Sequence, residues 1–146
     1  MNSAAILPEA RQAIIDEEQL RLLSIAHYVT GGLGIAFASI FIFHFVIFFV
    51  MANDPSFFPA PRAGQPAPPE HLFRVMSGLL GLFILAGWAF GALTIYVGRC
   101  IKRRAKRGLS LAVACVNLLF VPVGTLLGVS TIMVLSRPTV KRQYEV

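Results

Sequence analysis

Three long stretches of this sequence contain no Asp, Glu, Lys or Arg: residues 24–52, 75–98 and 109–136. Each is longer than the roughly 20 apolar residues that a helix needs to cross a hydrocarbon core about 30 Å thick. Backbone buried in lipid must also be helical to satisfy its own hydrogen bonds. The missing charge therefore predicts an all-α, polytopic integral membrane protein.

Cysteine is scarce, because Cys100 and Cys115 are the only two in the chain. We expect them at different depths, one beside a basic loop and one inside a span, so they support neither a disulfide framework nor a thiolate metal site. The uncharged stretches also lack the carboxylates and basic groups on which ion-coupled transport usually relies. With no catalytic, metal or cofactor motif, the sequence predicts a protein that is not an enzyme and binds no cofactor.

Among the predicted spans only the first contains histidine: His27 and His44 are 17 residues and so about 25 Å apart along a helix. Polar side chains at such depth are costly and are often functional. Because no other predicted span contains a histidine, a bis-histidine haem would need two subunits. We expect neutral histidines bonded to Ser24 or to a backbone carbonyl, and we keep both as candidate functional residues.

The thirteen basic residues are unevenly distributed and predict the orientation. Six of them crowd the connector 99–107, which we call the basic collar, whereas the proline-rich connector 53–74 holds two. The positive-inside rule places the collar in the cytoplasm and the connector 53–74 outside. Residues 1–23, a helix or tail with Pro8 and Glu9 suited to a first helical turn, are then cytoplasmic as well. The collar consists of Arg99, Lys102, Arg103, Arg104, Lys106 and Arg107.

The basic collar lies next to a predicted span and lacks interleaved aromatic side chains, so we do not expect it to bind nucleic acid. Juxtamembrane basic residues contribute about 1 kcal/mol each near an anionic surface. We expect the collar to set the topology and to bind anionic lipid headgroups, with the docking of an acidic partner as the alternative.

The third apolar stretch contains Pro122, Gly124 and Thr125 near its middle. Proline cannot donate to a helix ladder, glycine permits a reversal and threonine can cap a new helix. A hairpin there leaves 11 basic residues inside and 2 outside, whereas one long span kinked at Pro122 leaves 8 inside and 5 outside. The charge distribution favours the hairpin.

The predicted architecture is therefore a bundle of four membrane helices followed by a cytoplasmic basic tail, residues 137–146. Hairpin arms 109–121 and 125–136 would each reach only about 20 Å. We expect helix three to begin earlier and helix four to continue past Arg137, with basic side chains snorkelling to the headgroups. The four predicted spans are 24–52, 75–98, about 103–121, and 125–136.

Small residues recur at helical spacing within the predicted spans and would let helix backbones approach closely. The same pattern serves packing inside one chain or between copies. We expect mostly internal packing, in a homo-oligomer or a larger membrane-protein complex. The pairs are Gly34 with Ala38, Gly87 with Gly91, and Gly124 with Gly128.

Residues 20–28 and 117–141, the latter with a P-x-G-T-x-L-G-x-x-T-x-x-V-L pattern, resemble a widespread family of small, uncharacterised bacterial multi-span membrane proteins. The resemblance implies a location in the bacterial inner membrane and supports the hairpin. Some members carry a cysteine-rich, zinc-ribbon-like N-terminus, but this chain has no cysteine before Cys100, so no metal is implied. The family implies no activity.

These features lead us to expect a non-enzymatic structural or accessory subunit of a membrane assembly. The alternative is a homo-oligomeric channel or lipid-binding transporter, whose path would be lined by hydroxyl groups and His27.

Overall fold

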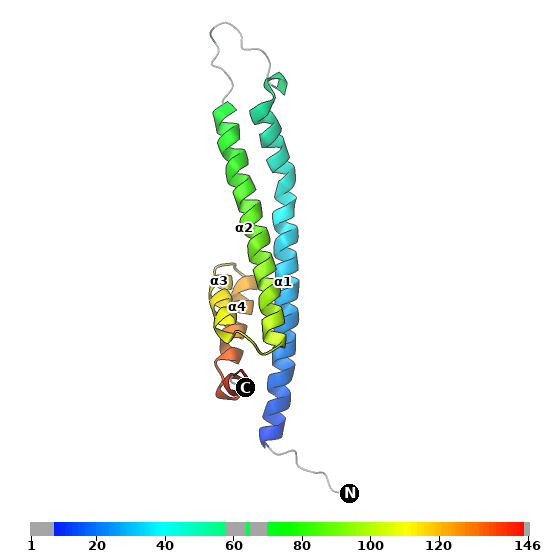
Figure 1. The fold of residues 1–146 in the computed structure, drawn as a ribbon, viewed down its shortest axis with the longest axis vertical. Helices are drawn as coiled ribbons and strands as arrows, with labels where there is room; N and C mark the ends of the chain where they lie inside the picture. Colours follow the sequence, from blue (N-terminus) through cyan, green and yellow to red (C-terminus); the bar gives the residue numbers. More distant parts are fainter. Residues whose placement is uncertain (1–7, 58–63, 65–69, 145–146) are drawn as a thin grey trace. The chain divides into compact units, whose positions relative to one another are not determined.

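The computed structural model describes residues 8–57, 64 and 70–144. Residues 1–7 and 145–146, and the parts 58–63 and 65–69 of the predicted outer loop, lie outside the described residues. All regular elements of the described chain are helical, which confirms the all-α class (Figure 1). They are α1 (Pro8–Asn53), the short 3-10 helix η1 (Pro55–Phe57), α2 (Glu70–Lys102), α3 (Arg107–Asn117), α4 (Val123–Leu135) and α5 (Pro138–Gln143).

Two helices are long and apolar enough to cross a membrane: Ala10–Asn53 within α1, and α2. Only 11% and 17% of their most apolar 18-residue windows are buried, whereas the core helix of a soluble protein is mostly buried. Helices α3 and α4 have 11 and 13 residues, which rise about 16 and 20 Å. Both are shorter than a hydrocarbon core of about 30 Å, so four complete spans are not confirmed.

The chain divides into two compact units. Residues 1–32 and 91–146 form one, which we call the terminal unit, and residues 33–90 form the other, the loop unit. Helices α1 and α2 contribute to both units, whereas α3, α4 and α5 belong to the terminal unit alone.

Helix α2 ends at Lys102 because the next turn leaves helical geometry. Arg104 and Lys106 have φ angles of 51° and 52°, in the left-handed region that residues other than glycine seldom adopt. The N–H of Ala105 donates to the carbonyl of Cys100 at 2.9 Å and closes the end of the helix. Helix α3 therefore begins at 107, and the expected extension of helix three back toward residue 103 is absent.

Helices α3 and α4 form the predicted hairpin, and they lie side by side in Figure 1. The chain reverses over residues 118–122, and the Val121–Pro122 peptide bond is cis. Thr125 Oγ1 donates to the carbonyl oxygen of Leu118 at 3.0 Å. Thr125 thus bridges the turn and does not cap α4 as expected, since the cap position is Pro122 and makes no side-chain cap bond.

Two glycines allow α4 to lie against α3. A Cβ atom on Gly128 would be 2.5 Å from the carbonyl oxygen of Ala114, and one on Gly124 would clash with the carbonyl of Asn117. Such distances do not occur for real side chains, so only glycine fits at either position. Gly124 serves close helix approach here, and the reversal itself is made by the residues before it.

In the loop unit, α1 and α2 are in close contact where Ala38 faces Gly87. Ala38 is 2% exposed, and a Cβ atom on Gly87 would lie 2.7 Å from its methyl group. Further along, the rings of Phe41 and Phe83 meet edge to face with centroids 5.2 Å apart. Small residues and aromatic rings together hold this pair of helix segments.

Candidate functional site

The basic collar divides into two groups. Two members contact the protein: Lys106 Nζ lies 2.8 Å from the hydroxyl of Tyr96, and Arg107 Nε donates to the carbonyl of Leu135 at 2.9 Å. Because Leu135 ends α4, Arg107 satisfies a carbonyl at the negative end of that helix. The other four are exposed at the end of α2 and in the turn after it: Arg99, Lys102, Arg103 and Arg104.

A cluster of polar side chains ties α1 to the segment that follows α4. Asp16 of α1 is fully buried, and Arg137 Nη1 lies 3.1 Å from its Oδ1. Thr139 Oγ1 donates to Asp16 Oδ2 at 2.5 Å. Gln12 Nε2 donates to Oδ1 at 2.9 Å, and Arg137 also donates to Gln19 at 2.7 Å. We call these five residues the polar latch.

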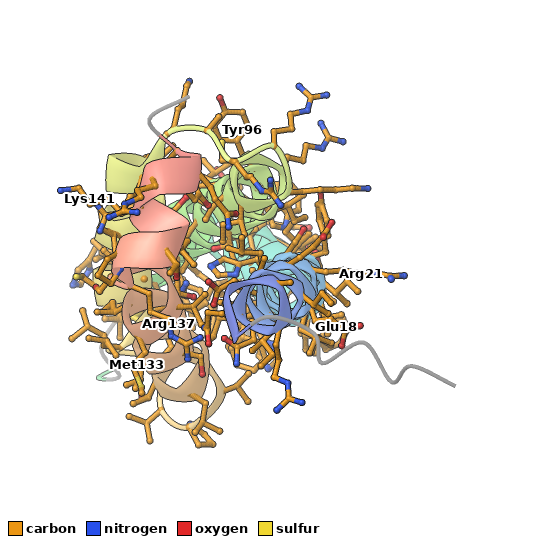
Figure 2. The ribbon with its side chains drawn as sticks, turned by 90° about the horizontal axis from the view of Figure 1, so that it is seen from below. Glu18, Arg21, Tyr96, Met133, Arg137 and Lys141 are labelled. Carbon is orange, nitrogen blue, oxygen red and sulfur yellow. The ribbon has the colours of Figure 1, made fainter. Side chains whose placement is uncertain are left out.

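The polar latch determines the charge state of its buried carboxyl. Burial raises the pKa of Asp16, but the hydrogen bonds from Thr139, Gln12 and Arg137, with the charge of Arg137, outweigh burial and lower the pKa below its ordinary value. Asp16 is therefore ionised at neutral pH. Figure 2 shows Arg137 lying between α5 and α1, so the latch holds α5 against the N-terminal part of α1 within the terminal unit.

The two candidate histidines have different surroundings. His27 is fully buried, and its Nδ1 lies 2.9 Å from the carbonyl oxygen of Leu23, one of the arrangements expected for it. Its Nε2 has no hydrogen-bond partner among the described residues. His44 is exposed in the loop unit, with its ring centroid 5.8 Å from that of Phe43.

The predicted small-residue pairs are used unequally. Gly34 is exposed, and a Cβ atom added to it would meet nothing within 4 Å. Gly34 therefore does not pack against another helix of this chain, and only another molecule could approach it. Gly91 is buried and takes part through its carbonyl oxygen, which would lie 2.7 Å from a Cβ atom on Gly31. Sequence reasoning did not single out Gly31. Its spacing of seven from both Ser24 and Ala38 places these three small residues on one helix face and is the signal that could have found it.

The terminal unit also has two surface pockets. The first, about 560 Å³, is a mostly apolar groove between α1 and α4 that includes Gln19 and Arg137 of the latch. The second, about 460 Å³, lies between α1 and the end of α2, and we call it the basic pocket. Its charged lining consists of Glu17, Arg21, Lys102 and Arg104. The structure thus places Lys102 and Arg104 of the collar in one pocket with Arg21 of α1, a grouping that was not predicted from the sequence.

Within the described ranges, no three His, Cys, Asp or Glu side chains gather as a metal site would require. Cys100 is buried, Cys115 is exposed, and both are free thiols. Comparisons with models of protein families, with curated proteins and with solved structures find no match. Inferences about function therefore rest on this chain alone.

Proposed function

We propose that this chain is a non-enzymatic integral membrane protein of the bacterial inner membrane and serves as a structural or accessory subunit of a membrane assembly. The observation that carries the proposal is the exposure of large apolar side chains along α1 and α2. Phe43 is 69% exposed and Leu82 is 65% exposed. Such surface is unfavourable in water, by about 25 cal/mol per Å², but it suits lipid or the apolar face of a partner helix.

In this proposal both chain ends are cytoplasmic. The charge asymmetry supports this, since the collar carries six basic residues on one side of the bilayer. The latch supports it independently, because Asp16 before the first apolar stretch binds Arg137 and Thr139 after the last one. A chain that crossed the bilayer once between α3 and α5 would place these partners on opposite sides.

The hairpin of α3 and α4 is proposed to enter the bilayer from the cytoplasmic face and return to it. Its tip is apolar and exposed, with Leu119 and Val121 each at 79%. The hydrogen bonds of the turn, including that from Thr125 to Leu118, reduce the cost of placing this backbone in lipid. Four complete spans, the arrangement expected from the sequence, would require α3 to be about nine residues longer and α4 about seven.

An accessory role needs a surface for another chain, and the exposed face around Gly34 supplies one. With open space at Gly34 and Phe37 58% exposed beside it, a partner helix could approach the backbone of α1. Close approach at glycine is the usual basis of helix association in lipid.

The test is to extract the tagged protein from its native membrane in mild detergent, measure its native mass and identify bound proteins. We expect a second membrane protein at a constant ratio, lost in Gly34→Leu but retained in Gly32→Leu, a matched control that also has open space around its Cβ position. A mass equal to one or several copies of 15.9 kDa plus detergent and lipid would contradict the accessory role.

A second candidate, a homo-oligomeric channel or lipid-binding transporter, is favoured by buried polar atoms that lack partners among the described residues: His27 Nε2, Ser110 Oγ and Asn117 Nδ2. Unpaired polar atoms are costly in a dry interior, and a water-filled path would satisfy them. Flux through proteoliposomes that changes in His27→Ala or Thr131→Val would favour this candidate. An electrically silent protein that always purifies with another would exclude it.

A further inference from the structure

The basic pocket gathers charge from three segments of the terminal unit. Arg21 comes from α1, Lys102 is the last residue of α2, and Arg104 lies in the turn that follows. Glu17, one helical turn before Arg21, is the one carboxylate in the lining. Three cations against one anion leave an excess positive charge in a cavity of about 460 Å³.

Only some residues of the basic collar line this pocket. The left-handed conformation of Arg104, with φ 51°, redirects the chain directly after the helix. Lys102, which ends the helix, and Arg104 belong to the pocket wall, whereas the neighbouring Arg99 and Arg103 do not. The four exposed cations of the collar therefore fall into two pairs: one pair lines the basic pocket and the other does not.

The pocket is also apolar at one end. Leu20 and Ile101 are buried in its wall, at 4% and 0% exposure, and Ile25 and Tyr28, at the start of the first apolar stretch, also line it. Along α1 the lining passes from Glu17 and Arg21 to these apolar side chains. A ligand that matches it carries negative charge at one end and hydrocarbon at the other.

We propose that the basic pocket binds an anionic phospholipid, with the phosphate of the headgroup among Arg21, Lys102 and Arg104 and the start of an acyl chain beside Ile25 and Tyr28. Basic pockets between helices at the cytoplasmic interface suit such headgroups, and guanidinium groups bind phosphate with charge-assisted hydrogen bonds. The inference rests on the proposed membrane location. It narrows the general attraction of the collar for anionic lipid to one site with a defined lining.

A charge-matched comparison tests the site. The full-length protein in detergent is titrated with phosphatidylglycerol or phosphatidylcholine of the same acyl chains, and the bound lipid is counted by native mass spectrometry. Lys102→Gln/Arg104→Gln should weaken phosphatidylglycerol binding about 25-fold, from about fivefold per basic residue. Arg99→Gln/Arg103→Gln removes the same charge from the same collar and should change it by less than about threefold. Equal losses, or no preference over phosphatidylcholine, would overturn the proposal.

For a second pair of variants we predict tighter lipid binding, a result that damage to the fold would not produce. Glu17→Gln removes the carboxylate from the pocket and should tighten phosphatidylglycerol binding about fivefold. Glu18→Gln is the control, because this neighbouring residue is exposed and does not line the pocket. Figure 2 labels Glu18 and Arg21 on the same helix. Unchanged or weaker binding in Glu17→Gln would contradict the assignment of this pocket.

A competition experiment separates lipid from free phosphate. Glycerol phosphate, which has the anionic group but no acyl chain, should not displace phosphatidylglycerol at equal concentration, and efficient displacement would overturn the lipid assignment. Cell fractionation keeps this result distinct from the wider proposal. A protein found in the soluble fraction would refute the membrane location, whereas a membrane protein without preference for phosphatidylglycerol would refute the pocket alone.

Discussion

The terminal unit and the loop unit use different interactions although both are built on α1 and α2. In the loop unit, small residues and aromatic rings bring the two helix segments together, as at Ala38 with Gly87 and Phe41 with Phe83. In the terminal unit an ion pair between half-exposed Arg137 and buried Asp16 adds specific polar contacts, and Asp16 and His27 are completely buried. A pair of uncharged helices can pack together in lipid. A buried charge, in contrast, needs hydrogen bonds and an opposite charge from several protein elements.

This difference shows which contacts determine how distant segments of the chain pack together. The hydrogen bonds from Thr139 and Arg137 to Asp16 join residues more than 120 positions apart, so they determine how α5 closes the terminal unit. Packing of methyl groups and rings is less selective, because many apolar side chains fill similar space. We expect removal of the latch cation, which leaves a buried carboxylate, to have a larger effect than any substitution in the loop unit.

The largest effect is expected for Arg137→Ala, which leaves the carboxylate of Asp16 buried without its cation. Removing one partner of a fully buried pair costs about 3 to 5 kcal/mol. Since the Arg137 side chain is 35% exposed, we expect about 3 kcal/mol of lost stability, measured by thermal or denaturant unfolding in detergent. Arg142→Ala, an exposed position in α5, is the control. Equal stability of the two variants would show that the latch does not hold the unit together.

A smaller effect is expected for Gly31→Ala in the terminal unit. The new Cβ atom would lie 2.7 Å from the carbonyl oxygen of Gly91, and overpacking of this kind costs about 2 kcal/mol. Gly32→Ala is the adjacent control, because nothing lies within 4 Å of its Cβ position and alanine favours the helix by up to about 1 kcal/mol. The two unfolding midpoints should therefore shift in opposite directions, and a shared direction would contradict the packing described.

The corresponding test in the loop unit is Gly87→Ala, where the added methyl meets that of Ala38. We expect a loss of about 1.5 kcal/mol, because the obstacle is a side chain and the helices can separate slightly. Gly78→Ala, on the same helix with open space, should be neutral or stabilising. A larger loss at Gly87 than at Gly31 would reverse the ranking of the two units.

The smallest effect is expected for Asp16→Asn, which keeps the shape of the side chain and removes its charge. We expect a loss of about 1 kcal/mol at neutral pH, the usual net contribution of one hydrogen bond. The folded state lowers the pKa of Asp16 from its ordinary 3.8, so its ionised form stabilises the fold above about pH 4. This contribution disappears as the pH falls through the lowered pKa.

Thermal unfolding of wild type and Asp16→Asn at pH 7, 5 and 3 checks that dependence. The difference in midpoint should be the same at pH 7 and pH 5 and should shrink at the lowest pH, as wild-type Asp16 approaches protonation. A difference that grows on acidification would mean that Asp16 is not held as a carboxylate.

Much of the helical architecture could be predicted from the absence of charge. The stretches 24–52 and 75–98 lie within α1 and α2, and Pro122 marks the break between α3 and α4. The exact lengths could not be predicted, because charged residues such as Glu17 and Arg21 continue a helix as readily as apolar ones. The turn that starts α3 only at 107 depends on left-handed backbone at Arg104 and Lys106, which residue type does not reveal.

The candidate sites were less predictable because their residues are distant in the sequence. Asp16 stands among polar residues, and nothing local distinguishes it from Glu17 or Glu18. A signal was present in its spacing, since Asp16, Leu20 and His27 share a helix face with Leu23, and all four are buried. Its partners Arg137 and Thr139 could not be inferred without knowing how the hairpin returns the chain.

The central claim is that the latch and the basic collar lie on the cytoplasmic side of a bilayer that α1 and α2 cross. Paired fusions of green fluorescent protein and alkaline phosphatase, placed after Val146 and within residues 58–69, test it most directly. After Val146 we predict a fluorescent green fluorescent protein and an inactive phosphatase. Within residues 58–69 we predict an active phosphatase and no fluorescence. Active phosphatase at both positions would place Arg137 and Asp16 on opposite sides of the membrane. Active phosphatase after Val146 would contradict the account in either case.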